Sequence, residues 1–492
     1  MASFSSILKQ TATDSLVVFS FKILAVPIAY LIPLMVARLY GAQLLGTYSI
    51  VANLLLTIAV FCRLGLDQGI LRFVAELQAK GKAGDAQRLL WPALFLATSL
   101  SGVLTLVIFF LGDWLAHRFH APQLPTMLTF AAFALPVIVA AFMFRETIRA
   151  LGGVRWVIFQ YSILTPLLML VLATLPAFLV PQVILPARTL GLALLLSNVL
   201  GLVFLGVKLR VDLKCQTYAR ENSFRELMRY SWPLFLSSII MLSMSSWDNL
   251  ILGLFNTPEK VAYYEAAIKT ASLVVFPLVA INAVVPPLFA KFYHWQDHAG
   301  LESLARATAG WTFSLALPLS LVGLLMAADL LQFFGMEFVE AKWALRLVVL
   351  GQLFNVACGS VGYILAMTGH QWSYTLIQAG STAVGIPLMI LTSWKYGLTG
   401  LAGVRALWLV ALNLLMSWAV WRHLGIKAFA GKVQAILVGG IIGVALFYIA
   451  EPYLGVIGGL VVFSLGYLAV VAKLMREEFA RLLRQPQFEE IK

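Results

Sequence analysis

Charged residues are scarce in this chain, and the shortage excludes most classes of protein. Of 492 residues, 12% are Asp, Glu, Lys or Arg, whereas 61% are hydrophobic. A water-soluble domain carries about 25% charged residues, so this chain lacks the polar surface that it would need in water. The same composition excludes disordered, collagen-like and disulfide-rich proteins. A polytopic membrane protein remains.

Cysteine is scarce as well, with only Cys62, Cys215 and Cys358 present. They show neither a pairing pattern nor metal-ligand spacing, so we predict no metal site. The sequence has no P-loop and no recognisable nucleophile–base arrangement. We therefore predict a protein that is not an enzyme, with no catalytic residues and no cofactor.

Long uncharged runs of about 20 residues are typical of transmembrane helices rather than of barrel strands. We predict an all-α polytopic membrane protein with about 14 transmembrane helices. Their approximate limits are 15–40, 45–72, 91–112, 126–148, 156–180, 186–208, 229–254, 261–290, 308–330, 343–367, 372–394, 398–421, 432–450 and 452–473.

The distribution of basic residues predicts the orientation. The net charge is +13, but the basic residues lie between apolar spans without interleaved aromatics, so we expect no nucleic-acid partner. The loops and termini on one side hold 24 Lys and Arg, and the opposite loops hold six. Both termini are therefore predicted to be cytoplasmic. The loops on the other side are too short for an enzyme domain.

The two halves of the chain resemble each other at an offset of 215 to 216 residues. For example, Ala150–Gly153 falls on Ala366–Gly369, and a tryptophan follows each stretch. Since the repeat unit holds six helices, both copies cross the membrane in the same direction. We expect two pseudo-symmetric six-helix lobes around a central cleft. The predicted parts are an N-terminal lobe (1–208), a basic cytoplasmic linker (209–228), a C-terminal lobe (229–425), helices 13 and 14 (426–473) and a cytoplasmic tail (474–492).

Charges inside apolar spans are expensive to bury, which makes them functional candidates. The candidates are Lys22, Arg63, Asp67, Asp248, Glu265, Lys269 and Arg405. A structural interpretation stays open: Arg63–Asp67 and Glu265–Lys269 are each four residues apart, so each can be a self-neutralising pair. Lys22 can likewise extend to the inner membrane interface.

Several motifs resemble those of a known family. Val36–Ser49, VARLYGAQLLGTYS, is similar to the first hairpin of bacterial polysaccharide and O-antigen flippases. Gly65–Arg72, Ser246–Gly253 and Ala366–His370 resemble the ends of that family's second, seventh and tenth helices. These flippases form the polysaccharide transporter branch of the multidrug/oligosaccharidyl-lipid/polysaccharide exporter superfamily. The likeness covers helices 1–12; many members have 12 helices, and the lipid II flippases have 14.

The resemblance implies a substrate and a location. The substrate would be a polyprenyl-pyrophosphate-linked oligosaccharide, a precursor of lipopolysaccharide or another cell-surface polysaccharide. The protein would turn it from the cytoplasmic to the outer leaflet of the bacterial inner membrane by alternating access. Membrane lipids are expected partners, and helices 13 and 14 either line a lipid groove or bind a polysaccharide-assembly enzyme.

The same resemblance suggests roles for the charged candidates. A pyrophosphate needs cations, and arginine offers it a planar fork of donors. The cations expected to meet the pyrophosphate are Lys22, Arg63, Lys269 and Arg405. The acids that are candidates for proton or sodium coupling are Asp67, Asp248 and Glu265.

Two other functions remain open on the sequence. A multidrug exporter of the same fold typically keeps an acid in helix 1, where this chain has Lys22. A glycan polymerase uses a large outer loop with Arg and His, which the short loops argue against. His294 and His298 flank Asp297 at helical spacing, a pattern more typical of a solvated face than of a metal site.

Overall fold

Every regular element of the described chain is a helix, which confirms the predicted all-α fold. The structure is a computed structural model that describes residues 4–80, 86–179, 186–212 and 224–427, with isolated residues beyond 427. Helices are expected here because a backbone in lipid must satisfy its hydrogen bonds within the spanning segment. The predicted helices 13 and 14 and the tail 474–492 lie outside the continuous described ranges.

The apolar helices match the first twelve predicted spans. Eight helices in the described part are long and apolar enough to cross a membrane, and two bent pairs raise this to ten. Moreover, α1 (Phe4–Arg63) and α17 (Gln371–Leu424) each join two helices at a glycine. Gly41 has φ 83° and Gly397 has φ 56°, values that glycine adopts without a Cβ penalty. Each of these long helices therefore contains two predicted spans.

The predicted second span, 45–72, is not continuous. Instead α1 ends at Arg63, and α2 (Leu66–Ala79) begins after Leu64 and Gly65, which both have positive φ. A Cβ on Gly65 would lie only 2.7 Å from the backbone nitrogen of Phe235. The chain breaks here because its backbone passes against α10 (Phe224–Phe255).

The chain forms two compact units. Unit 1 comprises Met1–Lys269, Leu331–Lys342 and Thr382–Leu401, and unit 2 comprises Thr270–Leu330, Trp343–Ser381 and Ala402–Lys492. These units cut across the two lobes expected from the repeat, because α10 and the first half of α11 (Pro258–Ile281) group with the N-terminal helices. The division into lobes stays a prediction.

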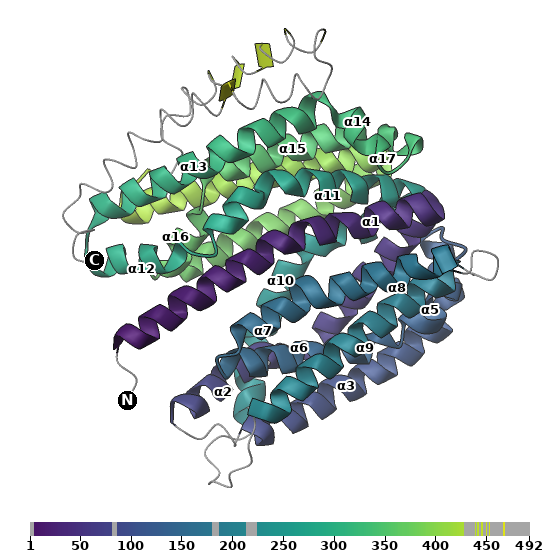
Figure 1. The fold of residues 1–492 in the computed structure, drawn as a ribbon, viewed down its shortest axis with the longest axis horizontal. Helices are drawn as coiled ribbons and strands as arrows, with labels where there is room; N and C mark the ends of the chain where they lie inside the picture. Colours follow the sequence, from purple (N-terminus) through teal and green to yellow (C-terminus); the bar gives the residue numbers. More distant parts are fainter. Residues whose placement is uncertain are drawn as a thin grey trace. The chain divides into compact units, whose positions relative to one another are not determined.

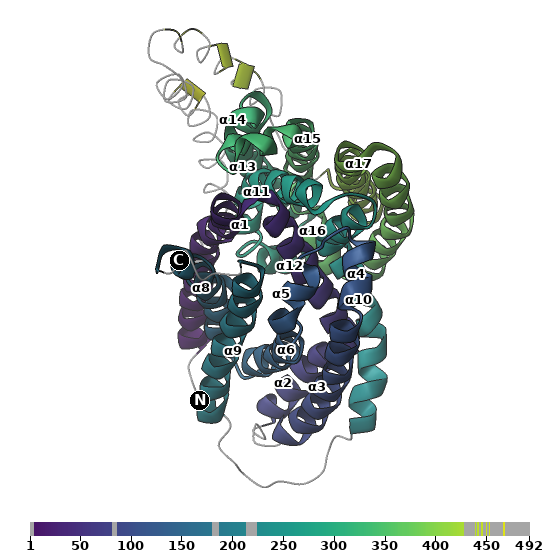
Figure 2. The ribbon, with the colours of Figure 1, turned by 90° about the vertical axis from the view of Figure 1, so that its right-hand side faces the viewer.

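In unit 1, α6 (Ala134–Ala150) lies at the centre and is buried along much of its length. It packs against α2, α3 (Ala86–Phe110) and α9 (Pro186–Asp212), side by side in Figures 1 and 2. The other N-terminal helices are α4 (Gly112–Arg118), α5 (Leu124–Ala131), α7 (Val154–Phe159), the π-helix η2 (Gln160–Leu164) and α8 (Thr165–Leu179). α10 lies against both α1 and α2.

Two segments from late in the sequence group with unit 1, Thr382–Leu401 of α17 and Leu331–Lys342. Leu331–Lys342 contains the end of α14 (Ala327–Gln332) and the 3₁₀ helix η3 (Met336–Ala341). Arg38 of α1 donates hydrogen bonds to the carbonyls of Gln332 (2.8 Å) and Phe333 (2.5 Å). These bonds satisfy carbonyl groups that a helix end leaves unpaired. Arg38 thereby fixes this segment on α1.

Unit 2 contains the second half of α11, α12 (Pro286–His294), α13 (His298–Leu325), nearly all of α15 (Lys342–Cys358), α16 (Val361–Met367) and the first and last parts of α17. α12 packs against both α13 and α16. Polar side chains join its helices inside the apolar core. Asn413 donates to Asn355 at 3.0 Å, and Ser360 bonds to Asn282 at 2.5 Å.

We expect Gly46→Ala to destabilise the protein by about 1–3 kcal/mol, the usual cost of overpacking. An added Cβ would overlap the backbone carbonyl of Pro258 at the start of α11, and backbone cannot move aside as a side chain can. Gly102→Ala is the matched control, since a Cβ there meets nothing within 4 Å. Thermal unfolding in detergent compares the two variants. Equal stability of both would contradict the close packing of α1 on α11.

Candidate functional site

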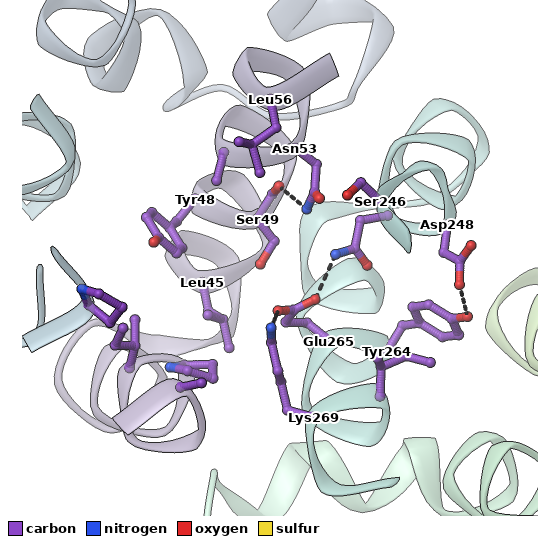
Figure 3. A pocket seen from close by; sticks show the side chains of 17 residues that line it. Leu45, Tyr48, Ser49, Asn53, Leu56, Ser246, Asp248, Tyr264, Glu265 and Lys269 are labelled. Atoms are coloured by element: carbon purple, nitrogen blue, oxygen red, sulfur yellow. Dashed lines mark hydrogen bonds and ion pairs between the residues drawn. The ribbon is translucent and has the colours of Figure 1, made fainter. Parts of the chain in front are cut away.

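A polar cavity of about 320 Å³ lies within unit 1, between α1, α8, α10 and α11. We call it the central cavity. Its lining combines prolines and aliphatic side chains with charged and hydrogen-bonding groups. The polar lining residues are Tyr48, Ser49, Asn53, Ser246, Asp248, Asn249, Tyr264, Glu265 and Lys269 (Figure 3).

Glu265 is the centre of the polar network in the cavity. Its Oε1 lies 3.4 Å from Nζ of Lys269, one turn further along α11. Its Oε2 accepts a hydrogen bond of 2.6 Å from Nδ2 of Asn249 on α10. Beside it, the hydroxyl of Tyr264 donates to Oδ2 of Asp248 at 2.8 Å. Figure 3 shows how these bonds tie α11 to α10.

The shape of α10 places the acid and amide at the cavity. The two parts of this helix, Phe224–Ser243 and Ser246–Phe255, are bent by 62°. The second part carries Asp248 and Asn249, which are both 7% exposed. The Lys269 side chain is 37% exposed and that of Glu265 14%, so this ion pair is open to the cavity on one side.

Two buried oxygens in the cavity lining have no hydrogen-bond partner within the described part of the chain. They are Oγ of Ser49 on α1 and Oδ1 of Asn249 on α10. Buried polar groups are nearly always hydrogen-bonded, to water where no protein group serves. Both residues line the cavity, so a molecule that fills it can donate to these two oxygens and accept from the serine hydroxyl. The arrangement therefore suits hydroxyl-rich or phosphorylated ligands.

A second group of charges lies around the ring of Phe142 in unit 1; we call Arg63, Asp67, Phe142, Arg145 and Gln160 the arginine cluster. Nη1 of Arg63 lies 2.6 Å from Oδ2 of Asp67, across the break between α1 and α2. The guanidinium carbons of Arg63 and Arg145 lie 3.8 and 4.6 Å from the centre of the Phe142 ring. Both arginines are buried. Cation–π contacts of this kind help to hold buried guanidinium groups.

The π-helix η2 positions the partner of Arg145. Nε of Arg145 donates a 2.9 Å hydrogen bond to Oε1 of Gln160, the first residue of η2. Nε2 of Gln160 donates in turn to Oγ1 of Thr165 at 2.7 Å. Single π turns are frequent at functional sites. Here the turn holds an amide oxygen against a buried cation.

The structure brings together five of the seven predicted charged residues. Asp248, Glu265 and Lys269 share the central cavity, and Arg63 pairs with Asp67 in the arginine cluster. The other two are not placed at either site. Lys22 is half-buried on α1, and Arg405 belongs to unit 2, where its guanidinium carbon lies 5.6 Å from the centre of the Trp408 ring.

Sequence reasoning missed Arg145 and Glu146, both buried on α6. It counted Arg145 with the basic residues of the adjoining cytoplasmic loop. The sequence did contain a signal for them, because both residues lie within the last turn of the predicted span 126–148. No group of three or more His, Cys, Asp or Glu in the described ranges could hold a metal ion. Asp297 instead caps α13 by accepting a hydrogen bond from Gly300.

Comparison with known families gives two matches. Residues 12–293 match the family described as polysaccharide biosynthesis protein, and this match covers more than half of the chain. Residues 233–391 match the MatE family. No curated protein sequence matches the chain.

The fold is similar to that of solved membrane transporters. The lipid II flippase MurJ, in an inward closed conformation, superposes with a TM-score of 0.73 at 12% identity, over 93% of this chain and 99% of MurJ. An inward-facing multidrug resistance MATE transporter of the MOP superfamily gives 0.68 at 15% identity, over 84% and 98%. The Vibrio cholerae MATE transporter VcmN gives 0.58 at 16% identity, over 86% and 99%. At these identities the likeness establishes the fold.

Proposed function

Since this chain belongs to the polysaccharide biosynthesis protein family and has the fold of MOP-superfamily transporters, we propose that it is a lipid-linked oligosaccharide flippase. It moves a polyprenyl-pyrophosphate-linked oligosaccharide, a precursor of lipopolysaccharide or another surface polysaccharide, between the leaflets of the bacterial inner membrane. Both termini face the cytoplasm, as the basic loops predict. Alternating access exposes the polar cavity to one side at a time.

The observation that carries the proposal is the polar lining of the central cavity. Ser49 and Asn249 present oxygens without protein partners, and Lys269 presents a cation that is partly open to the cavity. Sugar hydroxyls satisfy the oxygens, and a phosphate group pairs with the lysine. A volume of about 320 Å³ is small for a ligand pocket. The cavity therefore receives only the pyrophosphate and the sugar next to it.

Coupling to an ion centres on the acids of the same cavity. When phosphate binds Lys269, Glu265 loses part of its counter-charge, and its carboxylate becomes the site for the coupling ion. Asp248 keeps its bond from Tyr264 and serves as the second candidate. Lys22, Arg63, Asp67 and Arg405 remain predicted contributors at other stages of the cycle.

A multidrug exporter is the second candidate, and the MatE match over residues 233–391 favours it. Such a protein would bind cationic drugs at Glu265 or Asp248. Lys269 argues against this, because it already neutralises Glu265 at 3.4 Å. A lipid II flippase is the third candidate, and it shares the phosphate-binding chemistry.

The test measures polyprenyl-pyrophosphate-linked glycans by mass spectrometry in lipid extracts of a strain that lacks the protein. An impermeant glycan-modifying reagent then reports the leaflet that they occupy. We expect a complete oligosaccharide unit to accumulate on the cytoplasmic leaflet and the wild-type gene to relieve it. Unchanged glycan pools combined with sensitivity to cationic drugs would overturn the proposal in favour of the exporter. Accumulation of lipid II alone would identify the third candidate.

A further inference from the structure

Four of the six histidines of the chain line a single cavity of about 740 Å³ in unit 2. We call this cavity the histidine pocket. His294 ends α12, His298 begins α13, His370 directly precedes α17, and His423 lies in the last turn of α17. Tyr293, Gln296 and Met367 are among the other lining residues. Histidines up to 129 positions apart in the sequence thus bring their imidazole rings together in this pocket.

Two of the imidazoles form a stacked pair. The ring centres of His370 and His423 lie 4.5 Å apart, with 31° between the ring planes. Nδ1 of His370 lies 3.1 Å from Oγ1 of Thr368, and Nε2 of His423 lies 3.0 Å from Oγ of Ser373. Each ring thus uses one nitrogen within the protein. The second nitrogen of each has no hydrogen-bond partner in the part of unit 2 that the structure describes.

The charges around the pocket favour an anion. No carboxylate is among the lining residues. The two nearby acids of α13 are already engaged, since Asp297 caps the helix and Glu302 pairs with Arg306 at 3.4 Å. The ionisable groups near the pocket on the surrounding elements are Lys291, Tyr293 and His294 of α12, Asp297, His298, Glu302 and Arg306 at α13, Tyr363 of α16, His370, Tyr374, Arg422 and His423 at α17, and Lys427. The cations exceed the acids even when the imidazoles are neutral.

Exposed tryptophans place this end of unit 2 at the level of lipid headgroups. Trp295, Trp372 and Trp421 are 51%, 75% and 51% exposed, and each lies within two residues of a pocket histidine. Tryptophan is enriched at the membrane–water interface. Phosphate groups are the anions concentrated at that level. The described residues also contain no set of three ligands arranged for a metal ion, which removes the usual alternative for clustered histidines.

We propose that the histidine pocket binds a phosphate group, carried either by the headgroup of an anionic phospholipid or by inorganic phosphate. When the imidazoles are protonated, the second nitrogens of His370 and His423 donate hydrogen bonds to its oxygens, and Lys291 and Arg422 supply charge. The proposal goes beyond the flippase function and does not depend on the transported glycan.

Binding should tighten as the pH falls. Burial, reinforced by the neighbouring His423, lowers the pKa of His370 below its ordinary value of 6.5. A bound phosphate stabilises the imidazolium and so raises that pKa again. By linkage, the affinity for a phosphate of fixed charge then increases as the pH falls through the range in which the imidazole takes up its proton. Once the second protonation of the phosphate itself is accounted for, we expect about tenfold tighter binding at pH 5.5 than at pH 7.5.

The test uses the full chain with ¹⁵N-labelled histidine in maltoside micelles, a detergent without phosphate. NMR follows the imidazole titrations with no addition, with inorganic phosphate, or with short-chain phosphatidic acid. We expect the pKa of His370 to rise by about one unit with phosphatidic acid, and the signals of His117 and His120 to serve as internal references. A shift with inorganic phosphate as well shows that the free ion suffices, and a shift with the lipid alone identifies the headgroup.

Variants separate the pocket from general anion effects. His370→Asn/His423→Asn should remove the binding, whereas the matched double variant His117→Asn/His120→Asn should retain it. His120 has φ 52°, a conformation that asparagine tolerates. No titration shift of the wild-type pocket histidines with either phosphate source would overturn the proposal, whether or not the variants fold. Unchanged affinity in a folded His370→Asn/His423→Asn variant would do the same.

Discussion

Lys269→Met is expected to reduce flipping of the lipid-linked oligosaccharide by about tenfold or more. Hydrogen bonds to charged groups contribute about 1.5–3 kcal/mol, and the lysine is the cation that the central cavity offers to a phosphate. The side chain is 37% exposed, so its loss should affect transport more than folding. The leaflet assay on cells with matched protein levels measures the change.

Arg306→Met is the matched control for this prediction. Arg306 and Glu302 are also four residues apart with an N–O distance of 3.4 Å, and neither lines the central cavity. The double variant Glu265→Gln/Lys269→Met separates structure from function, because it removes both charges and leaves no carboxylate unpaired. We expect it to fold normally and still fail to flip. Full transport by this double variant would show that the ion pair is only structural.

Arg63→Ala is expected to lower the free energy of unfolding by about 3–5 kcal/mol, as breaking a buried ion pair usually does. Asp67 is 3% exposed, and without Arg63 its carboxylate would stay buried without its 2.6 Å partner. The variant also loses the contact between the guanidinium and the Phe142 ring. Thermal or denaturant unfolding in detergent measures the loss.

The control for Arg63→Ala is Arg72→Ala. Arg72 and Glu76 have the same spacing and a distance of 2.8 Å, but their side chains are 51% and 43% exposed, so the change should be at most about 1 kcal/mol. Arg63→Ala/Asp67→Ala should recover much of the lost stability. If this double variant also flips normally, the predicted roles of Arg63 in pyrophosphate binding and of Asp67 in coupling are wrong. If it folds and does not flip, those roles stand.

The sequence predicts the spans because lipid imposes long apolar runs. The first twelve correspond to helical regions, although several, such as 45–72 and 343–367, are divided between two helices. It also singles out Asp248, Glu265 and Lys269, because a charge in an apolar span is conspicuous. Ser49, Asn53 and Asn249 escape this reasoning, since neutral polar side chains are common in membrane helices. Their meeting with Glu265 depends on the bend of α10 and on the packing of α1 against it, which no local pattern encodes.

Local backbone geometry was the other feature that could not be predicted from the sequence. The break at Leu64 and Gly65 lies where the backbone approaches α10, and the π turn at Gln160 occupies only five residues within a longer helical stretch. Hydropathy is averaged over a window of many residues, so it does not reveal a change in backbone geometry at a single position. Arg145 was not predicted as a buried site residue for a related reason. At the end of a span, one turn of helix separates buried from exposed positions, and the packing of Arg145 against η2 determines that it is buried.

The unpartnered oxygens of Ser49 and Asn249 have a consequence for how the protein discriminates among sugars. When no glycan is bound, the cavity must hold water, because these oxygens require hydrogen bonds. A sugar that enters therefore exchanges water for hydroxyl groups, bond for bond, and gains little from each. A deoxy sugar displaces the water without replacing the hydrogen bond that the water made, and it leaves a protein oxygen without a hydrogen bond. Under the proposed flippase function, we therefore expect this site to reject glycans with a missing hydroxyl more strongly than it rewards those with the full set.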